Sequence, residues 1–131
     1  DVAGQEAALR DYIIPLIDAG IRVSMFIDPV EAQLEASQRI GAKAVELHTG
    51  AYAEGKSEEL KAIARIAGLT SAMPLECHAG HGLTVGNVGA VAAIPEIVEL
   101  NIGHFLMGEA MFHGMETAIH TMRRAMNGAR A

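Results

Sequence analysis

Three short stretches of the chain repeat one pattern that could carry acid–base chemistry. They read VELHTG at 45–50, LECHAG at 75–80 and VELNIG at 98–103. Alternation of polar and apolar residues with period two is typical of a β-strand, so each Glu shares one face with the His or Asn that follows it. Neighbouring strands would gather carboxylates and imidazoles on that face, which is costly in a core and useful in an active site.

His81 stands just past the third of the expected strands, in AGHGL at 79–83. Its flanking glycines let the backbone approach a ligand closely and leave the imidazole unobstructed. Histidine can donate or accept a proton near neutral pH. We therefore predict that His81 is functional; the alternative is a loop histidine packed against a neighbour.

A second glycine turn, Gly103-His104, follows the fourth expected strand, and a helix begins a few residues later. Free amides at a helix N-terminus attract phosphate. In (β/α)8 barrels, the loops after the last two strands commonly hold a phosphate group. The loops at 80–84 and 103–108 are therefore predicted to form a phosphate site.

A metal site is the competing interpretation of the same strands. It would use His48, His78 and one glutamate, ligands of the kind that bind zinc. The sequence has no tight motif such as His-x-His, and its glycines suit phosphate better, so we expect no metal. Glu76 and Glu99 could instead lie deeper and pair with cations from outside this chain.

Several other residues are predicted to be structural. Cys77 alternates away from Glu76 and His78 and should be a small buried hydrophobe. Five methionines at helical spacing are expected in the core, and His113 and His120 on the surface. Asp28 could line the mouth of the site or cap the following helix. The five methionines are Met107, Met111, Met115, Met122 and Met126.

Composition narrows the class of protein. The chain has 131 residues, half of them hydrophobic, and a formal charge of −6 without a basic run, which argues against a nucleic-acid surface. No stretch approaches the roughly 20 apolar residues of a membrane span, and no secretory signal opens the chain. A single cysteine suits a reducing cytoplasm. Because the first residue is Asp1 rather than Met, we expect the sequence to be a fragment, a processed product or the product of a partly determined gene.

The expected elements alternate regularly between helix and strand over one α/β unit, residues 1–131. Pro29 is expected in a first helical turn, and Ser57 and Thr84 are expected as helix caps. The segment 49–56 should be a loop. Helices are predicted at about 6–19, 29–40, 57–67 and 84–94, strands at 21–28, 44–48, 74–78 and 97–102, and a helical segment after residue 104, in two pieces around Gly114.

Repeated βα units imply parallel strands joined by right-handed crossovers. Two architectures fit: an open doubly wound sheet, or half of a (β/α)8 barrel, which needs roughly 250 residues. Central strands of an open sheet should be apolar on both faces, whereas these strands each have one polar face. The half barrel is therefore favoured, with the polar face lining the interior near the mouth.

With these residues in place, the chain resembles the pyridoxine 5′-phosphate synthase family essentially from end to end. The resemblance is carried by DVAGQ at 1–5, SMFID at 24–28, ELHTG at 46–50 with Tyr52, AGHGL at 79–83, IPE at 94–96 and ELNIGH at 99–104. It implies a (β/α)8 TIM barrel that assembles into larger oligomers, of which this chain would supply strands five to eight.

The resemblance also implies a reaction. It condenses 1-deoxy-D-xylulose 5-phosphate with 3-amino-1-hydroxyacetone 1-phosphate, giving pyridoxine 5′-phosphate, phosphate and water, with no metal or organic cofactor. By position, His81 matches the family's proton donor and Glu46 a carboxylate thought to stabilise transition states. Gly82, Gly103 and His104 match positions that hold the phosphate of the aminoketone.

The resemblance also shows what these 131 residues lack. The family uses a further histidine, a glutamate and sugar-phosphate-binding arginines from the first half of the barrel, and the loop after Tyr52 is shorter here than is typical. We expect the chain to be inactive alone and to associate, with the missing N-terminal half or with a second copy. The alternative is a non-catalytic phosphate-binding or interaction module derived from the barrel.

Overall fold

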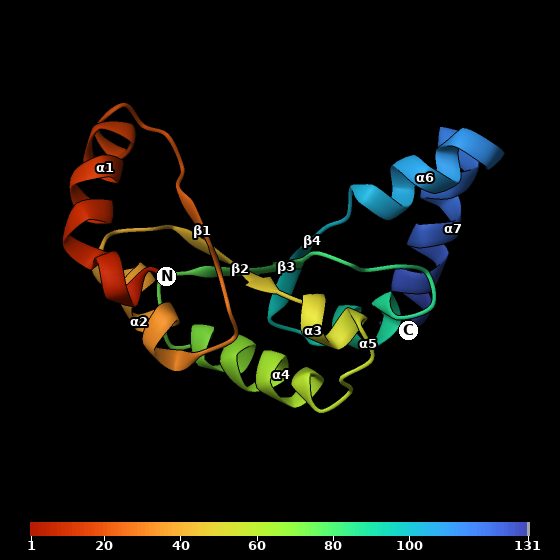
Figure 1. The fold of residues 1–131 in the computed structure, drawn as a ribbon, viewed down its shortest axis with the longest axis horizontal. Coiled ribbons are helices and arrows are strands. Elements are labelled where there is room, and N and C mark those ends of the chain that lie inside the picture. Colours follow the sequence, from red (N-terminus) through yellow and green to blue (C-terminus); the bar gives the residue numbers. More distant parts are fainter. Residues whose placement is uncertain (131) are drawn as a thin grey trace.

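The computed structural model describes residues 1–130 and contains one parallel four-stranded sheet flanked by helices (Figure 1). The strands are β1 (Ser24–Ile27), β2 (Ala44–His48), β3 (Glu76–Gly80) and β4 (Ile97–Asn101). The helices are α1 (Glu6–Asp18), α2 (Glu31–Arg39), α3 (Gly50–Ala53), α4 (Glu59–Thr70), α5 (Val88–Ala92), α6 (His104–His113) and α7 (Met115–Gly128), with a 3-10 turn, Ala3–Gln5, before α1.

The strand order decides between the two architectures. Each strand pairs in parallel with the next one in the sequence, in the order β1-β2-β3-β4. A doubly wound sheet reverses its strand order at a switch point, whereas a barrel advances by one strand in a constant direction. The predicted half of a (β/α)8 barrel is therefore confirmed, and the open doubly wound sheet is wrong.

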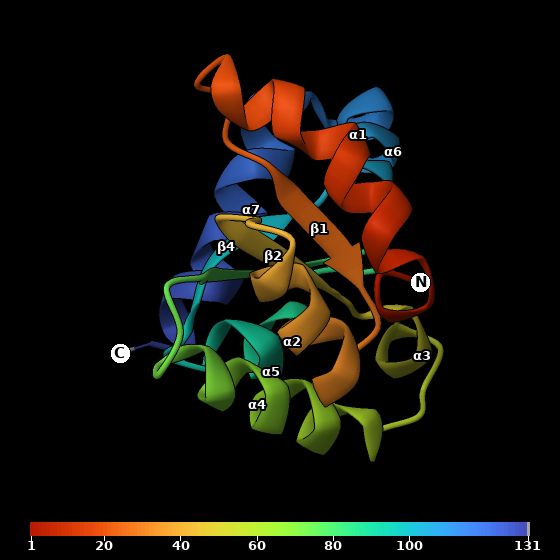
Figure 2. The same cartoon turned by 90° about the vertical axis from the view of Figure 1, so that its left-hand side faces the viewer.

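The two faces of the sheet differ in what covers them. Helices α2, α4 and α5 lie along one face, and the other face is open between α1 and the α6–α7 pair (Figures 1 and 2). In β2, Val45 and Leu47 are completely buried toward the helices, while Glu46 and His48 are half-buried on the open face. Leu34, Ile63, Ile66, Val88 and Val91 are fully buried with them and complete the core. Burying each such side chain contributes about 1.5–3 kcal/mol.

Several predicted boundaries are corrected by the structure. Strand β3 covers 76–80 rather than 74–78, β1 is shorter than predicted, and the predicted loop 49–56 contains α3. Helix α2 begins at Glu31, beyond Pro29, and α4 begins at Glu59 with no side-chain cap, so Ser57 does not cap it. Helix α5 begins only at Val88 because the Asn87 side chain accepts the Thr84 backbone N–H at 2.7 Å and closes a turn first.

The methionine prediction is partly wrong. Met122 is buried, but Met107, Met111 and Met115 are 58%, 83% and 44% exposed. Helical spacing identifies an apolar stripe, yet burial also requires an element to cover it, and these three residues are uncovered within the described chain. The break at Gly114 is confirmed, since its φ of +81° separates α6 from α7, and the surface positions of His113 and His120 are confirmed as well.

Strand β4 departs from simple alternation. Cys77 pairs with Ile97 and His78 with Glu99, so the register shifts and Val98 falls in a bulge. Val98 is consequently 61% exposed instead of packing on the helices as Val45 and Leu47 do. Cys77 is buried, as predicted. Its burial is the main reason that the pKa of the thiol is raised to about 12.

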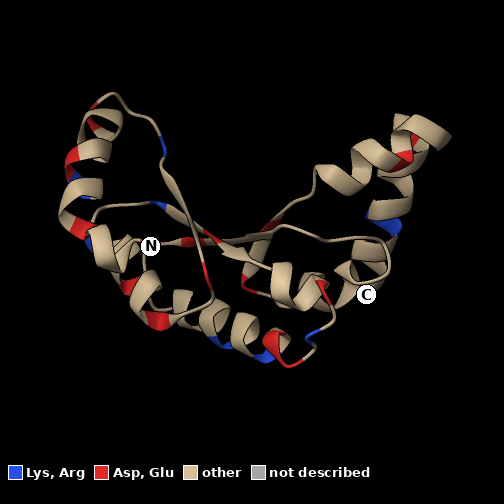
Figure 3. Cartoon of the chain, viewed as in Figure 1, with Lys and Arg blue, Asp and Glu red and all other residues tan. Residues whose placement is uncertain are grey.

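Acidic and basic residues are interspersed along the chain, on helices as well as on strands and loops (Figure 3). Together with the formal net charge of −6, this distribution argues against a nucleic-acid surface. No helix in the described part of the chain combines the length and the apolar character needed to cross a membrane.

Candidate active site

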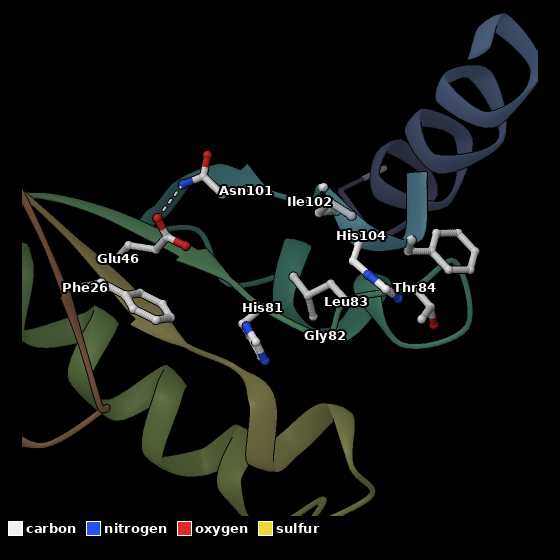
Figure 4. A pocket seen from close by; sticks show the side chains of 11 residues that line it. Phe26, Glu46, His81, Gly82, Leu83, Thr84, Asn101, Ile102 and His104 are labelled. Atoms are coloured by element: carbon white, nitrogen blue, oxygen red, sulfur yellow. Dashed lines mark hydrogen bonds between the residues drawn. The ribbon is translucent and has the colours of Figure 1, made fainter. Parts of the chain in front are cut away.

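A cavity of about 780 Å³ lies at the carboxyl ends of the strands, where side chains of parallel strands and their following loops converge (Figure 4). All five residues singled out from the sequence line it: Glu46, His81, Gly82, Gly103 and His104. The structure therefore brings residues from β2 and from the loops after β3 and β4 to one place. The remaining lining residues are Phe26, Leu83, Thr84, Asn101, Ile102 and Phe105.

Glu46 crosses the open face of the sheet from β2 toward β4. Its Oε2 accepts a hydrogen bond from Asn101 Nδ2 at 2.8 Å, drawn as the dashed line in Figure 4. The carboxylate rests on Gly80, where an added Cβ would stand 2.3 Å from Glu46 Oε1 and 2.9 Å from the Asn101 carbonyl oxygen. Residue 80 must therefore be glycine, because the Glu46 carboxylate and the Asn101 backbone leave no room for a Cβ. Asn101 belongs to the repeated pattern, but nothing in that pattern predicted that Asn101 would anchor Glu46.

His81 adopts an unusual backbone conformation. Its φ is +85°, which makes it the one residue other than glycine with positive φ in the described part of the chain, and Gly82 follows with φ +75°. The left-handed region is disfavoured for residues with a Cβ, and such conformations concentrate at functional sites. The two residues form a sharp turn directly at the end of β3, next to the cavity.

His48 packs against His81, a contact that sequence reasoning missed. The two imidazole rings stack with centroids 4.7 Å apart, and Phe26 meets His48 edge-on at 5.1 Å. A Cβ at Gly50 would lie 2.5 Å from His48 Cε1 and 3.1 Å from His81 Cδ2, so glycine leaves room for both rings. Asp28 is exposed at the end of β1, with Oδ1 3.9 Å from His48 Nδ1. The cap of α2 is Val30, without a side-chain hydrogen bond, so Asp28 does not cap this helix.

The loop after β3 is fixed by the segment that follows β2. The Tyr52 hydroxyl of α3 donates to the Asn87 carbonyl at 2.8 Å, and Asn87 in turn closes the turn at Thr84. A Cβ at Gly82 would come 2.7 Å from the Ala53 Cβ, so α3 and the loop are in close contact. The segment that follows β2, including Tyr52, therefore contacts and stabilises the loop that carries His81.

Backbone N–H groups at the N-terminus of α6 make the cavity suited to binding an anion. Helix α6 begins at His104 with Gly103 at the N-cap position, and the first amides of a helix have no partner within the helix. The lining contains no Lys or Arg. The charge of a bound phosphate would therefore be met by backbone N–H groups and by the imidazoles of His81 and His104.

A second polar cluster lies on the same face of the sheet and does not line this cavity. His78 is nearly buried, with Nε2 3.3 Å from Glu76 Oε2 and Nδ1 3.5 Å from Glu99 Oε1. Arg22 also pairs with Glu76, and Arg22 and then His78 hold the pKa of the Glu76 carboxyl below its usual value. Glu76 thus has a cationic partner, Arg22, within this chain, and Glu99 lies beside His78.

The histidines of the metal interpretation take part in different contacts. His78 lies between two glutamates of the cluster, while His48 stacks on His81 at the cavity. Among residues 1–130, no group of three or more His, Cys, Asp or Glu side chains is arranged to hold a metal ion. His48, His78 and a glutamate thus do not form the zinc-type site that the sequence left open.

The fold and the cavity together define a segment of a (β/α) barrel with acid–base side chains at its mouth. The family described as "Pyridoxal phosphate biosynthesis protein PdxJ" matches residues 1–128, and the chain belongs to this family.

Relatives named "Pyridoxine 5'-phosphate synthase" are similar over nearly the whole chain. The protein of Gluconobacter oxydans is 53% identical over 127 residues, which cover 97% of this chain and 55% of the relative. Those of Roseobacter denitrificans and Zymomonas mobilis are 49% and 50% identical over all of this chain and 56% and 53% of their own lengths. The chain therefore spans about half the length of these relatives.

Proposed function

We propose that this chain is part of a pyridoxine 5′-phosphate synthase and supplies half of its active site. The proposed reaction joins 1-deoxy-D-xylulose 5-phosphate and 3-amino-1-hydroxyacetone 1-phosphate to pyridoxine 5′-phosphate, with release of phosphate and water. The observation that carries the proposal is the convergence of Glu46, His81, Gly82, Gly103 and His104 on one cavity at the carboxyl ends of the strands.

In this proposal His81 is the proton donor. Ring closure with loss of water and phosphate requires protons to be delivered to leaving oxygen atoms, and an imidazole can do so near neutral pH. Glu46 is held by Asn101 at 2.8 Å, so its carboxylate needs little reorganisation to stabilise positive charge that develops at a nitrogen or a carbonyl carbon.

The phosphate of the aminoketone is proposed to bind between the loops after β3 and β4. Gly82 and Gly103 permit close approach of the backbone, and the N-terminus of α6 offers amides that point toward an anion. His104 at the first position of α6 adds a side-chain donor. No metal or organic cofactor is needed for these roles.

The 131 residues are proposed to be insufficient for turnover by themselves. The relatives are nearly twice as long, and both outer strands of the described sheet, β1 and β4, have a free edge. Such edges pair readily with other strands. We propose that they join the other half of the barrel, or a second copy of the chain, in the cytoplasm. Light scattering tests the self-association, and a stable monomer at high concentration would contradict it.

The synthase proposal is tested by completing the site. The chain is mixed with both phosphorylated substrates, with and without a separate polypeptide comprising the part of the Gluconobacter oxydans relative that this chain does not match. We expect pyridoxine 5′-phosphate only in the completed mixture, and none when His81→Ala replaces the natural chain.

The remaining outcomes of this experiment are equally informative. Product from the chain alone would show that the site is completed between copies. The prediction that the chain is inactive by itself would then be wrong. A stable complex of the two halves that binds phosphate but forms no product would favour the non-catalytic phosphate-binding module.

A further inference from the structure

Thr49 is a fully buried polar residue between β2 and α3. Its backbone N–H donates to the Gly80 carbonyl at 2.8 Å. Its hydroxyl oxygen lies 2.7 Å from the same carbonyl and 2.5 Å from the carbonyl of His81. Both carbonyls belong to the turn that ends β3, so one side chain spans the boundary between two neighbouring strands.

The hydroxyl has one proton and two neighbouring acceptors. The Gly80 carbonyl already accepts the Thr49 N–H, whereas the hydroxyl is the one donor to the His81 carbonyl among the hydrogen bonds of residues 1–130. The Thr49 hydroxyl therefore donates its proton to the His81 carbonyl. Holding this carbonyl fixes the peptide plane between His81 and Gly82, on which the conformations of both residues depend.

That plane joins two successive residues with positive φ, +85° at His81 and +75° at Gly82. Glycine adopts such a conformation freely, but histidine needs surrounding contacts to keep it there. The stacking of His48 on the His81 ring, at 4.7 Å, depends on the same turn, because it sets the direction in which the imidazole leaves the backbone.

We propose that Thr49 is a positioning residue whose hydroxyl holds His81 in its left-handed turn, with the imidazole stacked on His48 at the cavity. The importance of this position for catalysis rests on the proposed function, but the geometry itself does not. The chemistry requires a hydroxyl at residue 49, since a side chain of the same shape without a donor would leave the His81 carbonyl unsatisfied.

Two substitutions separate the hydroxyl from simple packing. Thr49→Val keeps nearly the same volume and removes the donor, while Thr49→Ser keeps the donor and removes a methyl group. If Thr49 only filled space, valine would be the milder change. If its hydroxyl positions His81, serine should be the milder change.

Nuclear magnetic resonance of the labelled 131-residue chain provides the measurement. A residue with positive φ gives a strong nuclear Overhauser effect (NOE) between its own amide and Hα protons, and stacked rings give NOEs between the imidazole protons of His48 and His81. We expect both signals in the natural chain and in Thr49→Ser, and their loss in Thr49→Val. Retention of both signals in Thr49→Val would overturn the proposal, as would their loss in Thr49→Ser.

A second measurement covers the case in which Thr49→Val unfolds too easily for spectroscopy. In a His81→Gly background the turn no longer needs support, because glycine adopts positive φ without strain. The drop in melting temperature caused by Thr49→Val should then be clearly smaller than in the natural chain. An equal drop in both backgrounds would refute the link between Thr49 and His81.

The proposed function is examined separately by titrating inorganic phosphate and following the amide signals of Gly103 and His104. Absence of binding there would argue against the phosphate site. The NOEs and the melting temperatures decide the role of Thr49 whichever result the phosphate titration gives.

Discussion

Replacing Gly82 by alanine should damage the candidate site through two separable effects. The new residue would keep a φ of +75°, which costs a residue with a Cβ about 1–2 kcal/mol. Its Cβ would also stand 2.7 Å from the Ala53 Cβ in α3, and overpacking of this kind costs about 1–3 kcal/mol. Together the free energy of unfolding should fall by about 2–5 kcal/mol, a large part of the stability of a small domain.

Gly55→Ala is the matched control. Gly55 also has positive φ, +100°, but a Cβ there would meet no atom within 4 Å. This variant should therefore lose only the conformational part, about 1–2 kcal/mol. The effect of alanine on the unfolded chain is common to both variants and cancels in the comparison.

Urea unfolding of the natural chain and the two variants measures these differences, and a rescue variant identifies the clash. In an Ala53→Gly background the new methyl at residue 82 has space, so Gly82→Ala should cost only about as much as Gly55→Ala. Titration of inorganic phosphate should show weaker binding for Gly82→Ala than for Gly55→Ala. Equal unfolding free energies for the two alanine variants would refute the close contact between α3 and the loop.

Three further predictions concern the packing of the core, the reactivity of the cysteine and the loss of stability at low pH. Met122→Ala should lower the unfolding free energy by about 2–5 kcal/mol and Met111→Ala by less than about 0.5 kcal/mol, measured by urea unfolding; equal losses would mean that Met111 is covered in solution. The Cys77 thiol, with its pKa raised to about 12, should resist iodoacetamide at pH 8 until urea unfolds the chain, and mass spectrometry of rapid labelling in the native state would contradict this. Because Arg22 and then His78 lower the pKa of Glu76, the stability that this ion pair contributes is present above the ordinary pKa of a glutamate and is lost as the pH falls through the lower folded value. Arg22→Gln should therefore flatten the decline of the urea midpoint on the acid side of that ordinary pKa, and an unchanged decline would show that the pair contributes nothing.

Much of the fold followed from local pattern. The alternation in 45–50 and 75–80 predicted strands with one polar face, and their regular recurrence between helices predicted parallel pairing. The polar residues also indicated where the site lies, because side chains at the carboxyl ends of parallel strands share one edge of the sheet. This pattern indicated His81 and the two glycine loops, whereas the choice of Glu46 among the carboxylates and the roles of Gly82, Gly103 and His104 came from the family resemblance.

Boundaries and burial were predicted less well, because both depend on contacts outside a local window. Helix α5 starts late because the Asn87 side chain competes for the Thr84 amide. Met111 is exposed although its spacing resembles that of buried Met122, since a stripe of apolar residues does not reveal what packs on it. The bulge at Val98 comes from the register between β3 and β4, which no alternation within one strand can show.

The sequence by itself determined the class of fold, the membership of its motifs in one family and the residue types available for proton transfer and phosphate binding. Tertiary structure alone decided how these residues are held. Three contacts show this: Asn101 anchors Glu46, His48 stacks on His81, and Thr49 contacts the carbonyls of Gly80 and His81. The residues that these contacts join are 31 to 55 positions apart in the sequence. Such contacts depend on the register and twist of the sheet, so they exist only once the sheet has formed.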